Sequence, residues 1–114
     1  MSDLDWLTDA VARTAAHEGR VEDETSVLWD CGDGPDGPVT VWWRVEHGRV
    51  VEAVPDGAGI DAECVLTLPY AQAVAISDGD ADPAVLFMQG VCKTEGDSGA
   101  VLRALPAACA SARG

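Results

Sequence analysis

The middle of the chain, where strand and helix signals alternate between glycines, constrains the fold most. Leu66-Thr67-Leu68 has the alternation of a strand, and Pro69 suits the first turn of a helix because it has no amide hydrogen to leave unpaired. Further on, Pro83 begins a second short apolar segment, Gly90 closes it, and a new strand runs until Gly96. The chain must therefore pass from one strand through helical segments into another.

The N-terminal part predicts one helix. Ser2 stands as its N-cap, the helix runs through about residue 16, and Gly19 follows as a stop signal. Its apolar stripe recurs at helical spacing and consists of Leu4, Trp6, Leu7 and Val11.

A three-stranded meander is predicted next. Residues 25–31 alternate, which places Val27, Trp29 and Cys31 on one face. The glycine- and proline-rich segment 32–38 predicts a hairpin loop, and residues 39–46 predict the second strand.

The turn into the third strand leaves the register open. His47-Gly48 predicts a tight turn into residues 49–54, with Glu46 facing Arg49. The same register would place Glu52 beside Trp43, which conflicts with an apolar core face.

The remaining elements complete an α+β order. The fourth strand, residues 64–68, turns Cys64, Leu66 and Leu68 to one face, and residues 70–76 predict a helix that is apolar almost all round. After a turn at 77–82 come a helix at 83–88, a fifth strand at 91–95, and a last helix that Pro106 interrupts or ends. The expected fold is a five-stranded, mostly antiparallel sheet with helices packed on one face.

Residues 87–97 read Phe-Met-Gln-Gly-Val-Cys-Lys-Thr-Glu-Gly-Asp. With the order of elements, this stretch resembles the sterol-carrier-protein family, the non-specific lipid-transfer fold, whose members carry Phe-Met-x-Gly-x-x-Lys-x-x-Gly-Asp or a close variant at this place. The resemblance is clearest over residues 39–105 of a single domain spanning 1–114. Most of these motif positions are apolar or glycine, and none is catalytic.

The resemblance implies a non-catalytic carrier that holds an acyl chain, sterol or similar apolar molecule in a tunnel, closed partly by the C-terminal segment 105–112. Thr94 would offer a hydrogen bond to the ligand head group, and Met88 is a flexible gap-filler suited to variable ligands. The residues expected to bind the ligand are Trp29, Trp43, Val45, Leu66, Leu68, Phe87, Met88, Cys92, Thr94, Val101, Leu102 and Leu105.

An empty tunnel would be costly. A void costs on the order of 24 cal/mol per Å³, so a ligand-sized cavity of roughly 300 Å³ would cost about 7 kcal/mol, comparable with the whole stability of a small domain. We therefore expect the cavity to be filled by a scavenged lipid or partly collapsed.

The net charge of −13 restricts the partners. It argues against nucleic acid and against docking on anionic membranes, since both need cationic side chains. The acids keep a small apolar-rich protein soluble, or form a docking face for a basic protein partner. The chain has no apolar run long enough to span a bilayer and no signal sequence, which predicts a cytoplasmic protein.

Neither a catalytic nor a metal signature is present. The chain lacks a nucleophile elbow, a phosphate loop and a dinucleotide fingerprint, so no cofactor is expected. Cys31, Cys64, Cys92 and Cys109 include no Cys-x-x-Cys pair, which argues against zinc and for free thiols. Two alternatives to the carrier stay open: an interaction or regulatory module with a filled core and an acidic docking face, and a small biosynthetic isomerase or cyclase.

Overall fold

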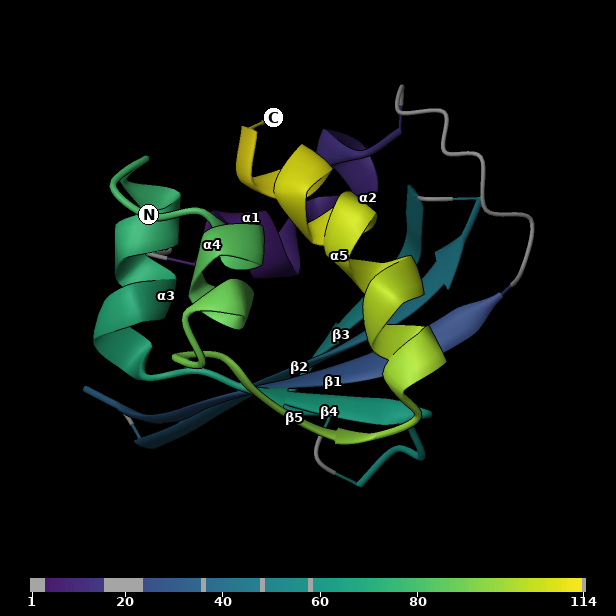
Figure 1. The fold of residues 1–114 in the computed structure, drawn as a ribbon, viewed down its shortest axis with the longest axis horizontal. Helices are drawn as coiled ribbons and strands as arrows, with labels where there is room; N and C mark the ends of the chain where they lie inside the picture. Colours follow the sequence, from purple (N-terminus) through teal and green to yellow (C-terminus); the bar gives the residue numbers. More distant parts are fainter. Residues whose placement is uncertain (1–3, 16–23, 36, 48, 58, 114) are drawn as a thin grey trace.

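The computed structural model describes residues 4–15, 24–35, 37–47, 49–57 and 59–113. A five-stranded sheet carries the helices on one face (Figure 1). The strands run in the order β3-β2-β1-β4-β5, and β1 and β4 are parallel while the other neighbouring pairs are antiparallel. The predicted fold class is confirmed. The strands are β1 (Thr25–Gly34), β2 (Gly37–Glu46), β3 (Arg49–Pro55), β4 (Cys64–Thr67) and β5 (Lys93–Gly96).

The helices differ from the prediction at both ends of the chain. The expected N-terminal helix is divided into α1 (Asp5–Thr8) and α2 (Ala10–Arg13), while its predicted N-cap, Ser2, and stop, Gly19, lie outside the described residues. At the other end, α5 (Ser98–Arg113) continues through Pro106. Between them lie α3 (Tyr70–Ser77) and α4 (Pro83–Met88).

Thr14 explains where α2 stops. Its hydroxyl Oγ1 lies 2.8 Å from the carbonyl oxygen of Ala10, one turn back, and accepts a hydrogen bond from the amide of Val50 in β3 at 2.9 Å. Because this buried hydroxyl bonds the helix and the sheet together, α2 ends where it meets β3.

The first hairpin is longer than predicted. The ladder between β1 and β2 continues to the pair Gly34 and Gly37, so most of the expected loop is strand. A bulge between Asp30 and Asp33 makes this possible, because Gly32 adopts a positive φ of 67° and its amide bonds the Asp30 carboxylate at 3.0 Å. Turn-forming residues here shape a bulge inside a strand.

A second bulge settles the register of β2 and β3. Glu46 faces Arg49 as predicted, and then one extra residue in β3 shifts the ladder. Trp43 is therefore opposite Ala53, and Glu52 is opposite Arg44 on the other face. The conflict between a glutamate and a core tryptophan is removed by the bulge.

Three tryptophans fill the space between the sheet and α1. Trp6, Trp29 and Trp43 are at most 1% exposed, and their ring centroids lie 5.1–6.1 Å apart in edge-to-face contacts. The indole of Trp6 donates to the carbonyl of Ala73 at 3.0 Å, and that of Trp43 to the carbonyl of Leu7 at 2.8 Å. This part of the interior is packed.

Small side chains bring α5 close to the sheet. Ala100, Ala104, Ala107 and Ala108 are fully buried, beside Val101 at 2% exposure. By contrast, α3, although apolar almost all round, fully buries only Ala73 and Ile76. In the part of the chain that the structure describes, no helix is long and apolar enough to cross a membrane.

Candidate functional site

A groove opens where the end of α3, the α3–α4 loop, α4 and the last turn of α5 meet. Its volume is about 620 Å³, within the range of small-molecule sites, and it is open to solvent. Its walls combine apolar or small side chains with two carboxylates: Ile76, Gly79, Asp80, Ala81, Asp82, Val85 and Ala112.

The loop that forms one wall is fixed by hydrogen bonds. The amide of Asp80 donates to the carbonyl of Ala75 at 2.8 Å, which closes α3, and Gly79 takes a φ of +79°. Asp82 caps α4, since its Oδ1 accepts from the amide of Ala84 at 2.9 Å. The Cys109 thiol from α5 donates to the same oxygen at 3.7 Å.

The opposite wall is held by the N-terminal helices. The guanidinium of Arg13 donates from Nε to the carbonyl of Ser111 at 2.5 Å and from Nη2 to that of Ala112 at 3.4 Å. The hydroxyl of Ser111 donates to the carbonyl of Trp6. The positive charge of Arg13 also interacts favourably with the negative end of the α5 dipole. Residues distant in sequence therefore fix the groove wall at Ala112.

Helix α3 contacts both the groove and the tryptophan cluster. Trp6 bonds the carbonyl of Ala73, and Ile76 lies one turn further along the same helix in the groove wall. A molecule that displaces Ile76 would act on the backbone that holds the Trp6 indole.

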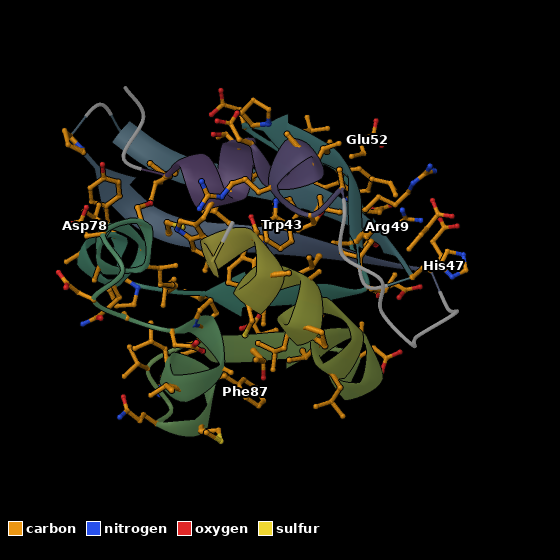
Figure 2. The ribbon with its side chains drawn as sticks, turned by 90° about the horizontal axis from the view of Figure 1, so that it is seen from above. Trp43, His47, Arg49, Glu52, Asp78 and Phe87 are labelled. Atoms are coloured by element: carbon orange, nitrogen blue, oxygen red, sulfur yellow. The ribbon has the colours of Figure 1, made fainter. Side chains whose placement is uncertain are left out.

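The sequence-predicted ligand residues do not line this groove. Most of them form the packed core at 5% exposure or less: Trp29, Trp43, Val45, Leu66, Leu68, Cys92 and Val101. Phe87 and Leu105 are half-buried, and Figure 2 shows Phe87 on α4.

Three of the predicted residues lie at the surface instead of covering the sheet. Met88 is 77% exposed at the end of α4, and Leu102 is 64% exposed. Leu102 points outward because its neighbour Val101 points inward, and successive helical residues are about 100° apart. Thr94 is exposed on the edge strand β5.

Most of the residues that line the groove come from residues 77–82, which the sequence predicts to be a turn. Their signal was weak: small residues Gly79, Ala81 and Ala112 beside apolar Ile76 and Val85. Only the packing of α5 against the α3–α4 loop brings them together. Ala112 belongs to the C-terminal segment that the family resemblance implied as a closing element.

The buried thiols are protonated at neutral pH. Burial, with Asp30 and Cys92 nearby, raises the pKa of Cys31 to about 12 from 9.0. Burial also raises the pKa values of Cys64 and Cys92 to about 11. A thiol is a poor nucleophile and metal ligand in this state. Among the described residues, no cluster of histidine, cysteine and carboxylate side chains could hold a metal ion.

These pKa values predict a loss of stability in alkali. Thiols of the unfolded chain lose their protons above about pH 9.0, whereas the folded chain retains them to about pH 11–12. The free energy of unfolding should therefore fall as pH rises from 9, by up to about 1.4 kcal/mol per pH unit for each thiol. Urea midpoints between pH 7.5 and 10.5 measure this. Cys31→Ala should give a shallower slope, and an unchanged slope would contradict the assignment.

The arrangement, a five-stranded mixed sheet with helices on one face, is that of the sterol-carrier fold. The chain is similar to palmitated sterol carrier protein 2-like 2 from Aedes aegypti at 17% identity and TM-score 0.67, over 90% of this chain and 92% of that one. A crystal structure of sterol carrier protein 2 matches at 19% identity and TM-score 0.65, over 97% and 88%. Sterol carrier protein 2 from Aedes aegypti in complex with palmitate matches at 18% identity and TM-score 0.60, over 96% and 98%.

The family is established by the sequence itself. The model of the SCP-2 sterol transfer family matches residues 7–105. The chain belongs to this family. A comparison with curated protein sequences finds no match.

Proposed function

We propose that this protein is a non-catalytic carrier of an apolar small molecule, a lipid, sterol or acyl thioester, and that the molecule binds in the groove between α3, α4 and α5. Its proposed location is the cytoplasm. Membership of the SCP-2 sterol transfer family supports the carrier, as do related structures that contain palmitate. The observation that carries the site is the groove of about 620 Å³, whose walls are apolar or small side chains apart from two carboxylates.

The packed tryptophan cluster directs the proposal to the groove and away from a preformed central tunnel. Trp6, Trp29 and Trp43 already occupy the interior beneath α1. A ligand that entered this layer would have to displace their contacts, whereas the groove is open. The lining residues that the structure describes include no serine, cysteine or histidine, which supports a binding role.

Binding can be tested with the neutral apolar dye N-phenyl-1-naphthylamine and with decanol as its competitor. We expect dye fluorescence to rise on binding and to fall as decanol displaces the dye. Val85→Trp fills the groove from α4 and should raise the dissociation constant at least about tenfold, a loss of about 1.4 kcal/mol. Met88→Trp is the matched control, since Met88 lies on the same helix but outside the groove walls.

The outcomes distinguish binding in the groove from binding at the exposed end of α4. Loss of binding in Val85→Trp alone supports the groove, whereas loss in Met88→Trp alone would move the site to the exposed end of α4. If the wild-type protein neither takes up the dye nor responds to decanol, the carrier proposal is wrong.

A second candidate function is an interaction or regulatory module. It is favoured by the same packed core and by the exposure of Met88 and Leu102 on neighbouring helices. This candidate predicts a basic protein partner whose binding weakens with salt, and no affinity for decanol or the dye.

A further inference from the structure

The two polar residues in the groove walls are both acidic. Asp80 and Asp82 lie in the α3–α4 loop beside Ala81, while the other lining residues are apolar or glycine. Asp78 adds a third carboxylate, exposed in the same loop. These side chains therefore place carboxylate groups at an otherwise apolar site.

These charges are not neutralised by the described residues. The partners of Asp82 Oδ1 are neutral donors, the amides of Ala84 and Val85 and the Cys109 thiol. Neither Asp80 nor Asp82 forms an ion pair within the described part of the chain.

Three of the basic side chains that the structure describes have other partners or lie elsewhere. Arg13, near Ala112, is directed to the carbonyls at the end of α5. Arg44 pairs with Glu24 and Glu46 on the sheet. Figure 2 shows Arg49 at the opposite end of the molecule from Asp78.

We propose, on the basis of the function proposed above, that the groove selects apolar molecules with a cationic head group, such as an alkylammonium ion, over fatty-acid anions. The apolar walls receive the chain, and the carboxylates of Asp80 and Asp82 attract the ammonium group and repel a carboxylate. This preference would distinguish the chain from its relatives whose structures contain palmitate.

Three ligands that share a ten-carbon chain test the head group: decylammonium, decanol and decanoate. Each is titrated against the wild-type protein at pH 7.5 below its aggregation concentration, by calorimetry. We expect decylammonium to bind at least about tenfold more tightly than decanoate, about 1.4 kcal/mol, with decanol between them. Added salt should narrow the difference because it screens exposed charges.

Two double variants distinguish attraction of the ammonium group by the groove carboxylates from attraction by the net charge of the whole protein. Asp80→Asn with Asp82→Asn removes the groove charges, and asparagine at position 82 keeps the cap of α4. In this variant we expect the affinities for decylammonium and decanoate to differ by no more than about threefold, or about 0.7 kcal/mol. The matched control, Asp33→Asn with Glu95→Gln, removes the same charge from exposed positions on β1 and β5 and should keep the wild-type difference.

Each outcome decides a separate point. If decanoate binds as tightly as decylammonium, the proposed selectivity is wrong, but the proposed carrier function is not contradicted. If the difference in affinity between decylammonium and decanoate persists in the groove variant, or falls equally in the control, the selectivity comes from the net charge of the protein. The proposed role of Asp80 and Asp82 is then wrong. If none of the three ligands binds, the proposed function itself fails.

Discussion

Replacing Trp43 by alanine is expected to lower the free energy of unfolding by about 3–5 kcal/mol. Trp43 is fully buried, contacts the rings of Trp6 and Trp29, and donates its indole hydrogen to the carbonyl of Leu7. The substitution removes these contacts and leaves a cavity together with an unpaired carbonyl. Since a small domain is stable by about 5–15 kcal/mol, the loss is a large part of the total. Urea unfolding followed by circular dichroism measures it.

Trp42 provides the matched control. It is the neighbouring residue on β2 but faces the other side of the sheet, where its indole donates to the carbonyl of Asp61 at 3.1 Å. Trp42→Ala removes the same atoms from beneath a loop, and we expect a loss of about 1–3 kcal/mol. If Trp42→Ala destabilises the protein more than Trp43→Ala, the tryptophan cluster is not the centre of the core.

The second large effect is expected at Gly96, a glycine of the family motif. Its φ is +95°, and a Cβ built there would lie 2.6 Å from the carbonyl oxygen of Glu63 and 3.1 Å from Cα of Cys64. Gly96→Ala therefore adds a clash with the backbone of β4 to an unfavourable conformation. The conformation costs about 1–2 kcal/mol and the clash about 1–3 kcal/mol more, to be measured as a shift in the urea midpoint.

Gly90 separates the two contributions. It also has a positive φ, +76°, but a Cβ there would meet no atom within 4 Å. Gly90→Ala should therefore show the conformational cost of about 1–2 kcal/mol alone. Equal losses in the two variants would contradict the close approach of Gly96 to β4.

The sequence predicted the faces of the strands better than their ends. Alternation placed Val27, Trp29 and Cys31 toward the helices, and the structure confirms that they are buried. It could not place the two bulges, because a bulge depends on the partner strand. The register of β2 and β3, which the sequence left open, shows this, since one inserted residue in β3 turns Glu52 to the other face.

The candidate site was harder to predict than the fold. The sequence pointed to Met88 in the family motif and to Leu102 in the last helix, both of which are exposed, whereas the groove lies where Ala112 meets the α3–α4 loop. That meeting depends on α5 continuing past Pro106 and on Arg13 holding its last carbonyls. Local sequence patterns carry no signal for such a contact between distant segments.

The central claim is that an apolar molecule binds in the groove, and methyl NMR spectra recorded during a decanol titration test it most directly. We predict that shifts concentrate on the methyl groups of Ile76, Ala81, Val85 and Ala112, and that Met88 and Leu102 change little. Unchanged spectra up to the solubility limit of decanol, or shifts confined to Met88 and Leu102, would contradict the account.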